Sequence, residues 1–226
     1  RDAECHAAIP TPEADLGRAV HGLDPTAGDP SADIFMEGIR TLLYQPLTAR
    51  RVPWIIHRAA ERDLAPFRAA TRRNGPSPFA DGLYLSITCG ESIALMDAGV
   101  AMAAARATTF GDYRLRRQTE ACAHWPSVEV AADHLVPVSG EAAVLFVSGR
   151  LDPVTPPEWA EAVSAGFPRS RHLVMPYSGH VFDGMSGIDT CLDPLMVMFL
   201  ETADADALDP TCLGEMRPPP FQTAAP

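Results

Sequence analysis

The stretch AVLFVSGRLDPVTPPEW, residues Ala143–Trp159, decides the fold. Its apolar run ends at Gly149, Asp152 follows, and three of the next five residues are proline. A nearly continuous apolar run of this length is typical of a parallel strand buried on both faces. The prolines restrict the turn, and Pro157 suits the first turn of a helix. The stretch therefore predicts a strand, a stiff turn carrying a carboxylate, and a helix.

A second apolar strand is predicted at His172–Pro176 and is followed by His180. The separation from Asp152 is 180 − 152 = 28 residues, which leaves room for one helix and one strand. A strand–helix–strand order predicts parallel strands, and open α/β sheets place their chemistry at the carboxyl ends of such strands. Asp before Pro is common in turns, and a lone histidine after glycine is often just a surface residue, so it is the pair that indicates catalysis. We expect Asp152 to accept the Nδ1–H of His180 and to stabilise its imidazolium.

A hydrolase of this type also needs a serine in a G-x-S-x-G turn upstream of the aspartate. The segments VSGRL, YSGHV and DGMSGID place serine near glycine, but not at this spacing. Neither Ser86 nor Ser92 has glycine at both positions two residues away. We therefore expect this chain to supply an acid and a base without a nucleophile, and to be inactive alone.

Residues 1–80 are interpreted as a separate layer of short helices, and residues 81–226 as part of an α/β sheet. Helical spacing predicts helices over 12–23, after an N-cap at Ser31, over 53–63 and over 64–73. NGPSPF at 74–79 predicts a linker.

Beyond the linker, Gly82–Cys89 is interpreted as a short strand or extended segment. Helices are predicted over 91–107, 110–126 and 187–203, the last with Leu192, Leu195, Met196 and Phe199 facing the core. Two strands and a possible third are too few for a complete sheet and would expose an edge and an apolar face. We therefore expect half of the domain to be missing.

Composition excludes several classes of partner. The 226 residues are 46% hydrophobic, which suffices for one domain with a core. The net charge of −11 argues against nucleic acid. No apolar run approaches the roughly 20 residues of a membrane span.

The five cysteines are an odd number. One interpretation is two disulfides in an oxidising compartment, which leaves Cys5 alone as if its partner lay before Arg1. The alternative is five reduced thiols in a cytosolic protein. We prefer the first, because no C-x-x-C spacing indicates a metal site. The sequence requires no metal and no cofactor.

Five segments share a pattern with one known family: GLYLSITCGES, FGDYRLRRQTEACAHWP, VLFVSGRLDPVTPPEWAEAV, LVMPYSGH, and the closing CLDPLMVMFL with LDPTCLGEMRPPPF. Together they resemble the C-terminal half of secreted bacterial α/β-hydrolases, the tripeptidyl-aminopeptidase-like (TAP-like) and proline-iminopeptidase-like proteins. The resemblance implies that residues 1–80 are mostly a helical cap and that 81–226 are the C-terminal part of the α/β-hydrolase core with a Pro-rich tail. It also implies that Asp152 and His180 are acid and base, and that the N-terminal half of the fold, with the serine, is missing.

The same resemblance implies an exopeptidase in which acidic residues hold the substrate's α-ammonium. By position, Glu91 is the candidate, and the alternative is that its charge merely favours a helix N-terminus. The resemblance further fits disulfides Cys89–Cys122, at the junction of cap and core, and Cys191–Cys212, which clips the tail. It implies a secreted or cell-envelope protein.

Three functions are compatible with these residues. The first is a serine peptidase that removes N-terminal residues or short peptides, seen here as its C-terminal part. The second is an esterase or amidase on small molecules, because a fold does not fix the substrate. The third is a non-catalytic fragment, or a partner chain that supplies Asp152 and His180 to a serine elsewhere.

Overall fold

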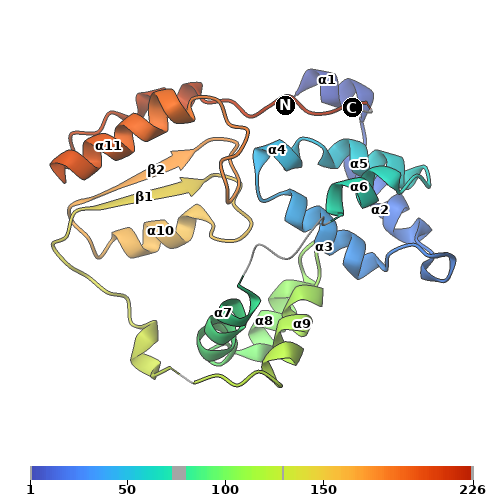
Figure 1. Cartoon of the computed structure of the whole chain (residues 1–226), viewed down its shortest axis with the longest axis horizontal. Helices are drawn as coiled ribbons and strands as arrows, with labels where there is room; N and C mark the ends of the chain where they lie inside the picture. The colour runs from blue at the N-terminus through green and yellow to red at the C-terminus, as the bar shows by residue number, and fades with distance from the viewer. Residues whose placement is uncertain (1, 73–79, 129, 225–226) are drawn as a thin grey trace. The chain divides into compact units, whose positions relative to one another are not determined.

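A computed structural model describes residues 2–72, 80–128 and 130–224 (Figure 1). The chain divides into two compact units. The first unit comprises Arg1–Gly22, Ile39–Phe67 and Pro137–Pro226, and the second comprises Leu23–Gly38 and Arg68–Val136. The expected division at residue 80 follows sequence regions, whereas these units cut across it, because residues 39–67 pack with the strands' unit. A cap role for residues 1–80 stays a prediction.

The first unit contains the predicted strand–helix–strand segment. Strand β1 (Val144–Gly149) pairs in parallel with β2 (Ser170–Met175), in a register that aligns Val144 with Ser170. Helix α10 (Pro157–Ser164) connects them, with a proline in its first turn as predicted. Figure 1 shows α10 on one face of the two strands and α11 (Asp193–Thr202) on the other. Both predicted strands and their crossover helix are confirmed.

The core of this sheet lies on the α11 side. Leu173 and Met175 of β2 are buried in one cluster with residues of η4 (Ile188–Leu192), α11 and η5 (Pro210–Glu215). Leu192 and Leu195 belong to this cluster and Phe199 packs against it, as predicted. Met196 does not, because it is one position further round the helix and is 39% exposed.

The helices predicted in the first 72 residues are present: α2 (Pro12–Gly22), α3 (Ala32–Leu42), α5 (Val52–Ala60) and α6 (Ala65–Thr71). Two short helices, α1 (Ala3–Ala8) and α4 (Pro46–Ala49), accompany them. Ser31 Oγ accepts from Ile34 N–H, as expected of an N-cap. The linker predicted at 74–79 lies outside the described residues.

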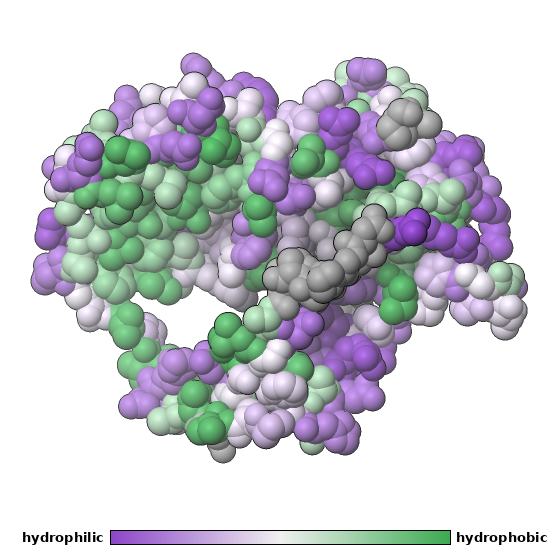
Figure 2. Space-filling view, viewed as in Figure 1, coloured by the Kyte–Doolittle hydropathy of each residue, from purple (hydrophilic) through white to green (hydrophobic). Residues whose placement is uncertain are grey.

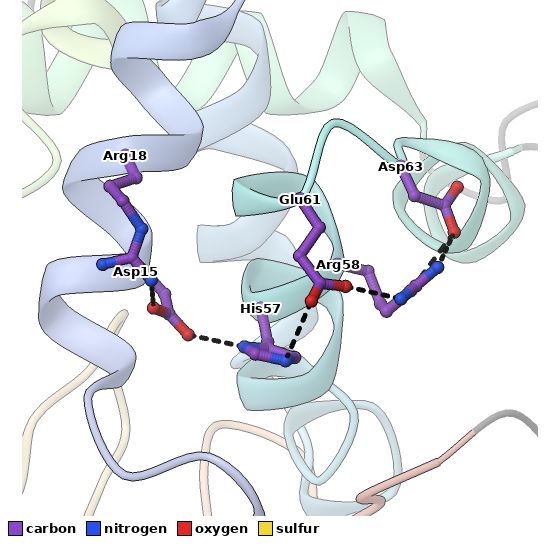
Figure 3. A network of polar contacts seen from close by, with 6 residues as sticks. All are labelled: Asp15, Arg18, His57, Arg58, Glu61 and Asp63. Carbon is purple, nitrogen blue, oxygen red and sulfur yellow. Dashed lines mark hydrogen bonds and ion pairs between the residues drawn. The ribbon is translucent and has the colours of Figure 1, made fainter.

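A polar network joins α2 to α5 in the first unit (Figure 3). The carboxylate of Asp15 is buried, with one oxygen 2.8 Å from Nδ1 of His57, and it also pairs with Arg18. His57 Nε2 lies 3.7 Å from Glu61, and Glu61 pairs with Arg58. A buried carboxylate needs such partners, since an unpaired one is costly.

The second unit is helical where it is described. Its elements are η1 (Pro25–Ala27), the start of α3, the end of α6, α7 (Asp81–Ile87), η2 (Thr88–Ile93), α8 (Ala98–Arg106), α9 (Tyr113–Cys122) and η3 (Ala132–Leu135). The helix predicted over 91–107 is broken before Asp97, whose side chain caps α8 by accepting from Val100 N–H.

The strand proposed at Gly82–Cys89 is wrong, because these residues form α7 and the start of η2. A short apolar run does not by its periodicity distinguish a strand from a helix. Tyr84 N–H bonds to Ala80 C=O, and Ser86 Oγ to Gly82 C=O, so the turn is closed locally. The sheet among the described residues therefore has two strands.

No single helix among the described residues is long and apolar enough to cross a membrane. The pair Asp81–Ile93 and Ala98–Arg106 passes this test by length and composition only when taken together, and it is bent by 106°.

Candidate active site

Asp152 and His180 come together at the carboxyl ends of the two strands. Asp152 follows β1 and His180 follows β2, and the strands are parallel neighbours. His180 Nδ1 lies 2.9 Å from Asp152 Oδ2, so the expected contact is present. Asp152 is 8% exposed, whereas the His180 side chain is 36% exposed. The carboxylate is therefore held inside while part of the imidazole faces outward.

The turn after β1 surrounds the Asp152 carboxylate with donors. The N–H groups of Val154 and Thr155 donate to Oδ1 at 2.7 and 3.0 Å. The hydroxyl of Thr155 donates to Oδ2 at 2.8 Å. Pro153 and Pro156 flank these donors and restrict their backbone. The stiff turn predicted from the sequence is thus a cradle for one carboxylate.

The environment holds the pKa of Asp152 below its ordinary value. Burial is the largest single influence and acts in the opposite direction, because it disfavours the charged form. The hydrogen bonds from the Thr155 backbone, His180, the Val154 backbone and the Thr155 hydroxyl together outweigh it. Asp152 is therefore ionised near neutral pH and acts as an acceptor towards His180.

Thr155 is a site residue that the sequence analysis missed. Its Oγ1 lies 3.2 Å from His180 Nδ1, so the hydroxyl touches both members of the pair. A signal was available, since an aspartate commonly accepts from the N–H groups two and three residues later. That pattern places the side chain at position 155 beside the carboxylate.

Tyr44 also reaches the pair and was missed as well. Its ring meets the imidazole of His180 edge to face, with the centroids 5.8 Å apart. Gly179 precedes His180 and packs against the same segment. Its packing requires glycine, because a Cβ there would lie 2.5 Å from the carbonyl oxygen of Tyr44. No local pattern predicts a contact between residues 136 positions apart (180 − 44 = 136).

Residues 106–212 match the family model described as TAP-like protein. The match includes β1, β2, Asp152 and His180, so the resemblance to the C-terminal half of TAP-like α/β-hydrolases is confirmed over this segment. It supports a hydrolase family and, with the parallel strand pair, an α/β fold. A search of curated proteins and a search of solved structures each found no match to the chain.

Glu91 lies before the TAP-like segment, on η2 of the second unit. Its Oε2 lies 3.4 Å from Nε2 of His134, and its side chain is partly exposed. This contact gives Glu91 a partner within its own unit. Its role towards a substrate stays a prediction.

The two expected disulfides are present. Cys89–Cys122 joins η2 to α9, and Cys191–Cys212 joins η4 to η5, with Cys191 and Cys212 inside the TAP-like segment. Cys5 is a free thiol, as expected. Two disulfides are consistent with an extracellular protein.

Two buried serines lie near the strand ends of the TAP-like segment. Ser148 Oγ bonds to Nε2 of His172 at 2.9 Å, on the α10 side of the sheet. Ser178 is wholly buried, and its Oγ has no hydrogen-bond partner in the described part of the chain. The one hydroxyl bonded to His180 within these described ranges is that of Thr155, and it lies at Nδ1 rather than Nε2.

Proposed function

We propose that this chain supplies the acid and base of a Ser-Asp-His triad in a serine hydrolase, an aminopeptidase that releases N-terminal residues or short peptides. The observation that carries the proposal is the 2.9 Å contact between His180 Nδ1 and the buried, ionised Asp152. It is supported by the TAP-like match over both residues.

In the proposed mechanism, Nε2 of His180 takes the proton of a serine hydroxyl as that oxygen attacks the scissile carbonyl carbon. Asp152 stabilises the imidazolium formed at this step, and its contact with Nδ1 leaves Nε2 as the basic nitrogen. His180 then gives the proton to the leaving amine, and an acyl-enzyme forms. In the second half, Nε2 takes a proton from water as the water oxygen attacks the acyl carbon. The ester bond to the serine oxygen then breaks, that oxygen receives the proton from Nε2, and the carboxylic acid product leaves.

The serine is proposed to lie on an N-terminal half of the same fold, outside these 226 residues. Parallel sheets are ordinarily larger and covered on both faces, yet β1 has one neighbour, β2, among the described residues. Figure 2 shows apolar residues at the surface over the strands. Val197 and Leu200 of α11 are also exposed. An apolar surface of this kind fits further strands and helices of the same sheet.

Glu91 is proposed to hold the α-ammonium of a peptide. The Glu91 carboxylate already contacts a histidine side chain, and a carboxylate can bind an ammonium group in the same way. Because the Glu91 side chain is partly exposed, a substrate could take the place of His134. The proposal predicts that Glu91→Gln weakens binding of peptides with a free N-terminus more than binding of N-acetylated ones. The protein is further proposed to act in a secreted or cell-envelope location, where its disulfides are stable.

A fluorophosphonate probe tests the function on a polypeptide that carries this chain together with the proposed upstream G-x-S-x-G serine. We expect rapid labelling of that serine and a loss of about 100-fold or more with His180→Ala, because an unactivated serine reacts poorly. His124→Ala, an exposed histidine in the matched segment, is the control and should label normally.

The 226-residue chain alone should not label. Labelling of a serine within it, or full labelling of His180→Ala, would overturn the proposal. Equal hydrolysis of esters and peptides with blocked N-termini would instead favour an esterase or amidase.

A further inference from the structure

We propose that Tyr44 is a positioning residue for the imidazole of His180. The inference rests on the proposed function, because it assigns to Tyr44 the orientation of the catalytic base. It arises from contacts between a segment at 43–47 and the loop at 179–184, which both belong to the first compact unit.

The two backbone segments contact each other on both sides of His180, by hydrogen bonds after it and by close packing before it. The carbonyl of Tyr44 accepts from Val181 N–H at 2.9 Å, and Leu47 N–H donates to the carbonyl of Asp183 at 3.0 Å. Gly179 lies so close that an added Cβ would meet both Tyr44 and Leu43 carbonyl oxygens, at 2.5 and 2.8 Å. The backbone that carries His180 is thus fixed against residues far upstream.

The side chains continue this contact. The rings of Tyr44 and His180 meet at an interplanar angle of 71° with centroids 5.8 Å apart, which is a favourable edge-to-face geometry. Asp152 and the Thr155 hydroxyl both contact the imidazole at Nδ1, and contacts at one ring atom leave the ring free to swing about that atom. The Tyr44 ring restricts that swing, and it is needed because the His180 side chain is partly exposed.

Tyr44 is itself held in place by Arg40, at the end of α3. Nη1 of Arg40 donates to the Tyr44 hydroxyl at 2.8 Å, and its guanidinium carbon lies 5.1 Å from the centre of the ring. The guanidinium therefore fixes the hydroxyl and covers the ring at once. The Tyr44 backbone is hydrogen-bonded and its ring is held by Arg40, so the ring has a fixed position against which the imidazole packs.

The test is an NMR measurement on the 226-residue chain with labelled histidine and tyrosine. In the wild-type chain we expect nuclear Overhauser contacts between the ring protons of Tyr44 and His180. An edge-to-face pair shifts an orientational equilibrium by about threefold to tenfold. We therefore expect the Nδ1 proton of His180 to exchange with water faster by that factor in Tyr44→Leu, and within about twofold of wild type in Tyr44→Phe, which keeps the ring.

Tyr113→Leu is the matched control, because Tyr113 also lies under an arginine, Arg116, but in the other compact unit. It should leave the exchange rate unchanged. Missing ring contacts in the wild-type chain would overturn the inference, even if Tyr44→Leu does not fold. A folded Tyr44→Leu with the wild-type exchange rate would overturn it too.

These outcomes are separable from those of the proposed function. If His180→Ala keeps full fluorophosphonate labelling, the catalytic role fails, while the exchange data still report whether Tyr44 orients the ring. If labelling is lost but exchange is insensitive to Tyr44, the function stands and the positioning role fails.

Discussion

The hydroxyl of Thr155 donates to Oδ2 of Asp152, the same carboxylate oxygen that faces Nδ1 of His180. Thr155 therefore holds the carboxylate in the orientation that the imidazole uses. We expect Thr155→Val to raise the pKa of Asp152 and to lower the free energy of unfolding by about 1.5–3 kcal/mol, the range for a hydrogen bond to a charged group. Thr155→Ser, which keeps the hydroxyl, should stay close to wild type. Carbon NMR titration measures the pKa of the Asp152 carboxyl group, and urea unfolding measures the free energy of unfolding. A Thr155→Ser variant that is destabilised as much as Thr155→Val would contradict this role.

Acid should destabilise the chain through Asp152. Its pKa is lower when folded than when unfolded, so its contribution to stability is present above the ordinary carboxylate pKa. That contribution is lost as the pH falls through the lower, folded value. We expect the stability of wild type to fall more steeply than that of Asp152→Asn between about pH 5 and pH 2. Urea unfolding at a series of pH values measures both slopes, and parallel curves would show that Asp152 contributes no such linkage.

The environment of Gly179 makes a sharp steric prediction. Gly179→Ala should destabilise the chain by about 1–3 kcal/mol, because the new methyl group meets backbone carbonyls that have little freedom to move. Gly17 in α2 is the matched control, since nothing lies within 4 Å of the Cβ position there. Gly17→Ala should stabilise by about 0.5–1 kcal/mol through helix propensity. Thermal unfolding compares the two, and a neutral Gly179→Ala would contradict the close packing.

The disulfides should contribute separately to the two units. Replacing Cys191 and Cys212 by serine opens a loop whose ends are 21 residues apart, and the chain-entropy estimate for that loop is about 3 kcal/mol. The same replacement at Cys89 and Cys122 opens a loop whose ends are 33 residues apart and should lower the free energy of unfolding by about 4 kcal/mol. Hydrogen exchange followed by mass spectrometry should show faster exchange in the first unit when Cys191 and Cys212 are replaced. It should show faster exchange in the second unit when Cys89 and Cys122 are replaced. Uniform acceleration in both variants would contradict independent units.

Much of the α/β part could be predicted from local pattern. The apolar run at Val144–Gly149 and the turn after it can be recognised because their residues are adjacent in the sequence. The spacing to His180 leaves room for only one crossover helix. Parallel pairing then brings the two strand ends together, so Asp152 and His180 were found without knowledge of the rest. The disulfide pairs followed from a family resemblance instead.

The failures have physical causes. Gly82–Cys89 has residues that suit a strand, but no strand in the described part of the chain pairs with it, and a disulfide at Cys89 joins it to a helix. Tertiary context decides such segments, because β propensity depends on the neighbouring surface. Met196 was predicted to face the core, but it lies one position past the buried Leu195 of α11 and is exposed. The contact of Tyr44 with His180 could not be predicted, because the two residues are far apart in the sequence and no local pattern links them.

The ties between residues 43–47 and the loop at 179–184 limit how this protein can be divided or recombined. A fragment that starts at residue 81 would lose the acceptor of Val181 N–H and the donor to Asp183 C=O. Exchange of the first 80 residues for those of another protein would also replace Tyr44, whose ring packs beside His180. Such chimaeras should retain residues 39–47 from this chain, because these residues belong to the strands' unit and contact the loop that carries His180.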